Sequence, residues 1–147
     1  MDGFVLVCTG NTCRSPMAEA LLRQALAARG VTGYEVTSAG IYAAAGEPAS
    51  PNAVMAMREL GLDISKHRAR QLTKELAAGK VVLCMTESHA RAARQLLGDV
   101  RIRLLGEAVS DPFGGDLAEY RRCAAQLKRL CEAISFEFVT KSNNLTI

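Results

Sequence analysis

A strand–loop–helix segment near the N-terminus constrains the fold of this chain more than any other feature. Residues Phe4–Val7 form a short apolar run, and a helical pattern extends from Pro16 to Arg29. The connection between them is the short string CTGNTCRS, Cys8–Ser15. A strand that turns so quickly into a helix directs successive backbone N–H groups inward, and these groups form an anion-binding cradle with the positive end of the helix dipole. The sequence therefore predicts an anion site at the end of the first strand.

Two side chains of this connection carry the chemistry expected of such a site. Cys8 follows the strand directly, and its thiolate is expected to be stabilised by the N–H dipoles and by Arg14. The planar guanidinium of Arg14, at the far end of the loop, suits bidentate contact with phosphate oxygens. Ser15 is a favoured helix N-cap whose hydroxyl can also reach the Cys8 sulfur, and Pro16 fits the first helical position. Together these residues predict a site for a phosphoryl group.

Gly10 and Asn11 give the loop the freedom that a tight turn requires, since both tolerate positive φ angles. The alternative interpretation is a buried cysteine at the end of a strand, followed by an ordinary capped helix. That alternative explains neither Arg14 nor the turn at Gly10 and Asn11. The segment is therefore more specific than a lone glycine-rich loop.

The rest of the chain alternates between strand-like and helix-like segments. Further strands are expected at Glu35–Ser38, Val81–Met85 and Arg101–Leu105, and further helices at Asn52–Leu60, Glu87–Leu97 and Leu117–Ile134. This alternation indicates βαβ units and a parallel sheet, the α/β class, with ligands bound at the carboxyl ends of the strands. The length of 147 residues suits a single domain, residues 1–147, in which Ser135–Ile147 is expected to be a frayed tail.

The composition argues against several classes of partner. A net charge of +3 is too small to indicate nucleic-acid or membrane binding, and no apolar run approaches the roughly 18 residues of a membrane span. With two histidines and no clustered ligand spacing, no metal site is expected. Five cysteines without a recognisable export signal favour reduced thiols in the cytoplasm, and their odd number argues against a full disulfide framework.

The string VCTGNTCRSP, Val7–Pro16, resembles the phosphate-binding loop of the low-molecular-weight protein tyrosine phosphatase family. The resemblance extends over about residues 4–134 and implies a three-layer α/β/α fold with a central four-stranded parallel sheet. It also implies an enzyme that acts on phosphorylated proteins without a cofactor. A monomer is expected, although the sequence does not determine the oligomeric state. The phosphate-binding residues implied by the resemblance are Thr9, Gly10, Asn11, Thr12, Cys13, Arg14 and Ser15.

Asp111, Pro112 and Phe113 form the second chemical element. Removal of a phosphoryl group requires a proton for the leaving group, and a positioned carboxylic acid can supply it. Taken alone, the string DPFGG is most simply a turn, but its position relative to the Cys8 loop resembles the general-acid loop of the same family. The resemblance implies a two-step mechanism. Cys8 attacks phosphorus while Asp111 protonates the leaving group, and water then hydrolyses the phosphocysteine.

Three further residues are assigned by resemblance. Ser38 matches a serine that hydrogen-bonds the loop asparagine, here Asn11, and His67 matches a histidine in the same supporting network. Taken alone, Ser38 would be an ordinary strand end and His67 a solvated loop residue. Cys13 matches the partner in a reversible Cys8–Cys13 disulfide that shields the nucleophile from overoxidation, and its alternative role is a small buried side chain that fills space.

The residues Thr12 and Phe113 distinguish two branches of the family. Members acting on phosphotyrosine commonly carry a bulky apolar residue at the position of Thr12 and a tyrosine at the position of Phe113. The strings CTGNTCRS and DPFGG instead resemble the bacterial protein-arginine phosphatases, in which the loop threonine is implied to favour phosphoarginine. We expect a phosphoarginine phosphatase, with a tyrosine phosphatase as the alternative. Tyr42 and Phe113 are candidate aromatic walls for the substrate stem, or else partly buried loop residues.

Two other classes are less well supported by the sequence. An arsenate reductase of the same fold relays a disulfide through additional cysteines, but the position seven residues after Cys84 is Arg91. A non-catalytic phosphoprotein-binding module would keep Arg14 but would need neither Cys8 nor Asp111. Both are present.

Overall fold

Four parallel strands form the centre of the molecule in a computed structural model, which describes residues 1–98 and 100–145. The strands are β1 (Gly3–Cys8), β2 (Glu35–Gly40), β3 (Lys80–Cys84) and β4 (Ile102–Leu104). Their order in the sheet is β2-β1-β3-β4, and every neighbouring pair is parallel. The prediction of a four-stranded parallel sheet is therefore confirmed, and β1, which carries the anion-binding loop, lies in its interior.

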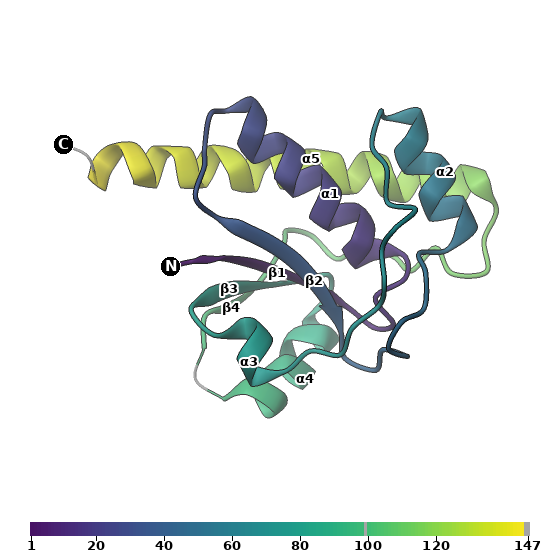
Figure 1. Ribbon diagram of the computed structural model, residues 1–147, viewed down its shortest axis with the longest axis horizontal. Helices are drawn as coiled ribbons and strands as arrows, with labels where there is room; N and C mark the ends of the chain where they lie inside the picture. The colour runs from purple at the N-terminus through teal and green to yellow at the C-terminus, as the bar shows by residue number, and fades with distance from the viewer. Residues whose placement is uncertain (99, 146–147) are drawn as a thin grey trace.

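Helices cover both faces of the sheet. Figure 1 shows one layer above it, consisting of α1 (Arg14–Ala28), α2 (Pro51–Glu59) and α5 (Leu117–Leu145). The layer on the opposite face consists of α3 (Lys74–Ala77) and α4 (Glu87–Leu97). This three-layer α/β/α arrangement agrees with the predicted fold class. None of the helices in the described ranges is both long and apolar enough to cross a membrane.

The alternation of side chains along β1 explains why an uninterrupted apolar run was needed there. Phe4 and Leu6 pack into the core shared with α1, α2 and α5, whereas Val5 and Val7 pack into the core on the side of α4. All four are fully buried. A parallel strand covered on both faces requires apolar residues at successive positions, as the sequence Phe4–Val7 supplies.

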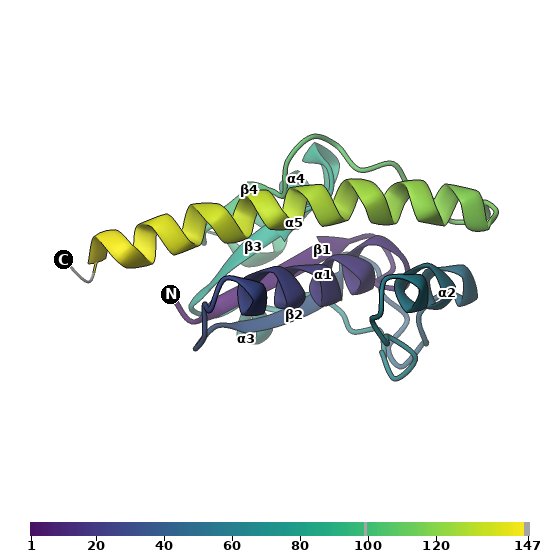
Figure 2. The ribbon, with the colours of Figure 1, turned by 90° about the horizontal axis from the view of Figure 1, so that it is seen from above.

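The last helix is longer than the sequence predicts. Figure 2 shows α5 lying beside α1 and continuing past it toward the C-terminus. Beyond Ile134, the helix buries Ser135 and Phe138, and the Phe138 ring packs edge-on against Phe4 with centroids 4.8 Å apart. The chain is therefore helical to Leu145, which differs from the frayed tail predicted at residues 135–147; residues 146–147 lie outside the described residues.

Two other local expectations need correction. Helix α1 begins at Arg14 with Cys13 as its N-cap residue, so Ser15 lies inside the first turn and does not cap the helix. The single-turn helix α3 was not predicted. It begins after Thr73, whose hydroxyl accepts a hydrogen bond from the backbone N–H of Leu76. Such a short element has no hydrophobic periodicity that could have revealed it.

Candidate active site

The thiol of Cys8 lies where β1 ends and the loop to α1 begins. Its Sγ atom is 2.9 Å from the hydroxyl of Ser15, which lies in the first turn of α1. The start of α1 at Arg14 therefore explains the role of Ser15: its side chain turns back toward the sulfur rather than toward the helix N–H groups. At this distance the hydroxyl and the thiol are hydrogen-bonded, and either group can be the donor.

Asn11 holds the loop in shape. It is the one non-glycine residue with a positive φ, 59°, in the described part of the chain. Its side-chain amide donates to Ser15 Oγ at 2.8 Å and to Ser38 Oγ at 2.9 Å, and its Oδ1 accepts from the backbone N–H of Arg70 at 2.9 Å. His67 Nε2 lies 2.7 Å from the backbone oxygen of Asn11. The structure thus places Ser38 and His67 against Asn11, as the family resemblance implies.

The supporting network extends one step further than predicted. The Ser38 hydroxyl donates to Glu19 Oε1 at 2.7 Å, and Glu19 forms an ion pair with Arg23. Both residues lie on α1, so the helix that follows the loop also fixes the serine that supports it. The i,i+4 spacing of Glu19 and Arg23 indicates their ion pair but not the contact with Ser38, which joins separate elements.

Glycine is required at Gly40 rather than at Gly10. Gly10 does not have a positive φ, and a Cβ there would lie 3.8 Å from the Thr12 hydroxyl oxygen, an ordinary contact. A Cβ on Gly40 would lie 2.5 Å from the backbone oxygen of Thr9. The end of β2 can therefore approach the loop closely only because Gly40 has no side chain.

Arg14 is fixed beneath the loop with part of its hydrogen-bonding capacity unused. Its Nη1 donates to the backbone oxygen of Val109 at 2.9 Å, and its Nη2 lies 3.7 Å from Asp111 Oδ2. Its side chain is buried, and its Nε has no hydrogen-bond partner among the described residues. A buried guanidinium N–H without a partner is costly, so this donor is suited to an anionic ligand in the pocket.

The predicted catalytic residues share one pocket of about 210 Å³. Phe113 stands at its edge with 75% of its surface exposed, whereas Tyr42, which is 81% exposed, is not among the lining residues. The structure therefore supports Phe113 and not Tyr42 as an aromatic wall. The lining residues are Cys8, Thr9, Gly10, Thr12, Cys13, Arg14, Asp111 and Phe113.

Cys13 is the second thiol of the pocket, and three hydroxyls lie near its Sγ, the farthest being that of Thr12 at 3.8 Å. Its Sγ is 3.0 Å from Ser50 Oγ and 3.2 Å from the Tyr120 hydroxyl. Burial, followed by the hydrogen bond to Cys13, raises the pKa of Tyr120 to about 12, so its hydroxyl remains protonated. Cys8 and Cys13 are both free thiols in this structure, and the disulfide between them remains a prediction.

A residue that the sequence reasoning did not assign also contacts the loop. His89 lies near the start of α4, with Nε2 2.9 Å from the Thr9 hydroxyl and Nδ1 2.9 Å from the Thr86 hydroxyl. Burial, then the positive charge of Arg14, lowers the pKa of His89 to about 4. No local motif in the sequence marks His89, because its partner Thr9 lies 80 residues earlier in the chain.

The remaining cysteines lie in the core. Burial raises the pKa of Cys84, Cys123 and Cys131 to about 12 in each case. None of the three lines the pocket of Cys8. They are therefore packing residues.

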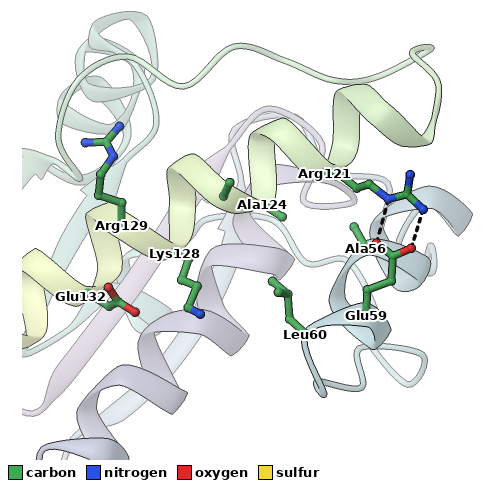
Figure 3. A pocket seen from close by; sticks show the side chains of 9 residues that line it. Ala56, Glu59, Leu60, Arg121, Ala124, Lys128, Arg129 and Glu132 are labelled. Atoms are coloured by element: carbon green, nitrogen blue, oxygen red, sulfur yellow. Dashed lines mark hydrogen bonds and ion pairs between the residues drawn. The ribbon is translucent and has the colours of Figure 1, made fainter.

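A second hollow, of about 400 Å³, lies between α2 and α5 and contains none of the predicted catalytic residues. Its floor includes Ala56, Leu60 and Ala124, and at one end Arg121 forms two hydrogen bonds to the Glu59 carboxylate (Figure 3). The hollow therefore holds an apolar floor and a satisfied ion pair but no nucleophile. Within the described ranges, no three acidic, histidine or cysteine side chains are grouped as a metal site would require.

Residues 4–144 match the family described as low molecular weight phosphotyrosine protein phosphatase. The probable low molecular weight protein-tyrosine-phosphatase EpsP of Ralstonia solanacearum is 40% identical over 137 residues, which cover 88% of this chain and 91% of that protein. The protein-arginine-phosphatase of Geobacillus stearothermophilus is 37% identical over 148 residues, which cover 94% of this chain and 97% of that protein.

Solved structures give the same result. The YwlE arginine phosphatase from Geobacillus stearothermophilus superposes with a TM-score of 0.89 at 34% identity, covering 98% of this chain and 97% of that one. A cysteine-to-serine mutant of a YwlE arginine phosphatase, with a phosphorylated active-site serine, superposes with a TM-score of 0.86 at 33% identity, covering 92% and 94%. This chain belongs to the low-molecular-weight phosphotyrosine protein phosphatase family.

Proposed function

We propose that this protein is a cysteine-dependent phosphatase that removes the phosphoryl group from phosphoarginine residues in proteins. The observation that carries the proposal is the arrangement of three side chains around one pocket. Cys8 lies in the loop, the partly unsatisfied guanidinium of Arg14 lies beside it, and the Asp111 carboxylate lies 3.7 Å from that guanidinium. A nucleophile, an oxyanion ligand and a proton donor are the groups that phosphoryl transfer through a cysteine requires.

The first chemical step forms a covalent intermediate. The Cys8 thiolate attacks phosphorus, the S–P bond forms, and the P–N bond to the arginine side chain breaks. Asp111 in its acid form donates a proton to the departing guanidine nitrogen, and Arg14 with the loop N–H groups binds the phosphoryl oxygens. The related mutant with a phosphorylated active-site serine supports covalent transfer at the position of the nucleophile.

The second step returns the enzyme to its starting state. The Asp111 carboxylate takes a proton from water as the water oxygen attacks phosphorus, and the S–P bond breaks. Inorganic phosphate leaves, and Cys8 is again a thiolate beneath the Ser15 hydroxyl. The same carboxyl group therefore acts first as an acid and then as a base.

Thr12 supports arginine over tyrosine as the phosphorylated residue. It lines the pocket beside the nucleophile, and its β-branched side chain is smaller than the bulky apolar residue common in tyrosine-directed members. A relative named as a protein-arginine-phosphatase aligns over 94% of this chain. The second candidate, a phosphotyrosine phosphatase, is favoured by the similarity to the probable tyrosine phosphatase EpsP. The five free thiols suit a reducing compartment, and we infer action in the cytoplasm.

The deciding experiment measures kcat/KM on phosphoarginine and phosphotyrosine peptides of the same sequence. We expect a preference for phosphoarginine that Thr12→Ile weakens or reverses, since an ethyl group in place of the hydroxyl narrows the pocket. Thr12→Val is the matched control, because it removes the hydroxyl while keeping the shape. A preference for phosphotyrosine that Thr12→Ile leaves unchanged would identify a tyrosine phosphatase and would contradict the proposal.

A further inference from the structure

The imidazole of His89 is clamped between two threonine hydroxyls, one of which belongs to the active-site loop. Nε2 lies 2.9 Å from Thr9 Oγ1, and Nδ1 lies 2.9 Å from Thr86 Oγ1. Thr86 is the N-cap residue of α4, and its hydroxyl oxygen also accepts from the backbone N–H of His89. His89 is 7% exposed. The ring is therefore held from the helix side and has its other nitrogen directed at the loop.

A ring in this position has a defined hydrogen-bonding direction. Because the pKa of His89 is lowered to about 4, the imidazole is neutral near neutral pH, with one nitrogen as a donor and the other as an acceptor. Each of the two threonine hydroxyls must then take the complementary role. The orientation of the Thr9 hydroxyl is consequently set by α4 rather than by solvent.

Thr9 occupies a position at which its fixation affects the loop next to the nucleophile. It directly follows Cys8 and lines the pocket. Its backbone oxygen accepts from the N–H of Tyr42 at 2.9 Å, so Thr9 is fixed through both its backbone and its side chain. Asn11, two residues later, is fixed separately, by Ser38 of β2 and by the backbone N–H of Arg70 in the loop that follows α2. The loop thus has two anchoring points, and His89 belongs to the one nearer the nucleophile.

We propose that His89 is a positioning residue of the active-site loop, whose Thr86-braced imidazole fixes Thr9 and, through it, the geometry around Cys8. The proposal deepens the phosphatase function and rests on it. His89 does not line the pocket, so it acts on bound phosphate only through Thr9. Its loss is expected to weaken the binding of phosphoryl oxygens by the loop without altering the pocket's charge.

Two substitutions separate the two contacts of the ring. The amide of asparagine reaches about as far as Nδ1, so His89→Asn keeps the contact with Thr86 and loses that with Thr9. The amide of glutamine reaches about as far as Nε2, so His89→Gln keeps the contact with Thr9. With p-nitrophenyl phosphate as substrate, we expect kcat/KM to fall about tenfold in His89→Asn and to stay within about threefold of wild type in His89→Gln. Equal losses in the two variants would overturn the proposal.

A double-mutant cycle with Thr9→Val distinguishes positioning from a general structural effect. If His89 acts through Thr9, Thr9→Val alone should lose about tenfold, and His89→Asn should cause no further loss in that background. Losses that multiply would contradict the proposal. The Kd for inorganic phosphate, measured by calorimetry on the same four proteins, should show the same cycle. If His89→Asn does not fold, Thr9→Val alone still tests the contact. A wild-type Kd for inorganic phosphate in Thr9→Val would refute the proposal.

Different experimental results would refute this inference and the proposed function. A wild-type protein that hydrolyses neither p-nitrophenyl phosphate nor phosphoarginine would refute the proposed function. The phosphate-binding cycle would still show whether His89 and Thr9 are coupled. A fully active wild type with an independent His89 would refute the inference alone.

Discussion

The guanidinium of Arg14 lies 3.7 Å from the carboxylate of Asp111, and both groups line the pocket of Cys8. Arg14 is buried and anchored to the backbone oxygen of Val109, whereas about half of the Asp111 side chain is exposed. The pair thus joins a fixed cation to an accessible acid. A phosphoryl group that enters the pocket would first meet the Arg14 guanidinium, which the protein holds in place. The more exposed Asp111 carboxyl group is free to follow the leaving group.

Arg14→Lys should lower kcat/KM on any phosphorylated substrate by about 10²–10³, the usual effect of losing an oxyanion ligand. Lysine keeps the charge but loses the planar fork and the fixed bond to the Val109 oxygen. Steady-state kinetics with p-nitrophenyl phosphate measure the loss. Arg121→Lys, which alters only the surface pair with Glu59, is the matched control and should behave as wild type. Equal activity of both variants would show that the charge alone suffices.

Asp111→Asn should reduce cleavage of the P–N bond more than cleavage of an aryl phosphate. Guanidine is far more basic than a phenol, whose pKa is about 10, so its departure depends more strongly on protonation. We expect a loss in kcat of about 10²–10⁴ on phosphoarginine and a smaller loss on p-nitrophenyl phosphate. Single-turnover measurements on both substrates test this. Equal losses would show that Asp111 does not protonate the leaving group.

Alkylation should distinguish Cys8 from the core thiols of Cys84 and Cys131. Burial raises the pKa of Cys84 and Cys131 to about 12, so neither provides a reactive thiolate near neutral pH. Cys8 lines the pocket and should react with iodoacetamide, and inorganic phosphate should protect it. Peptide mass spectrometry after brief treatment reports each site. Rapid modification of Cys84 in the native protein would contradict the assignment of that thiol to the core.

The stability of the protein should fall as the pH is lowered from 6.5 to about 4, in part because of His89. Within this window the unfolded chain binds a proton at this histidine, while burial and Arg14 keep the folded ring neutral. Asp111 opposes this effect, because its negative charge raises the pKa. His89→Gln removes the linkage, so its unfolding free energy should depend less on pH than that of wild type. Urea unfolding across the window measures both slopes, and parallel slopes would rule out His89 as a source.

Local patterns along the chain predicted most of the fold. The apolar run Val81–Met85 and the helix Glu87–Leu97 are found within one residue of their predicted bounds. Burial on both faces of the sheet leaves a continuous apolar run, and caps at Thr86 and Gly98 mark the ends of the helix. Helix α1 begins at Arg14 rather than at the predicted Pro16, because the loop and not a serine cap determines where the helix begins. The extension of α5 depends on Phe138 packing against Phe4, a contact between the two ends of the chain that local patterns do not encode.

The site was predictable where one motif carries several residues and less so where the fold unites separate segments. Cys8, Arg14 and Ser15 lie in one string, and Asp111 was found through its own loop. His89 is eighty residues from its partner Thr9, and its spacing in the sequence indicates no chemistry. Contacts of this kind appear only when parallel strands bring their carboxyl ends to one edge of the sheet.

Strand β1 carries Phe4 near one end and Cys8 at the other. Phe138 of α5 packs against the first of these residues, and the second, the proposed nucleophile, lines the pocket. A contact that stabilises the fold and the proposed nucleophile therefore lie at opposite ends of one strand. Changes in the C-terminal half of α5 are expected to alter how long the enzyme survives heat or denaturant, while leaving which bond it breaks unchanged.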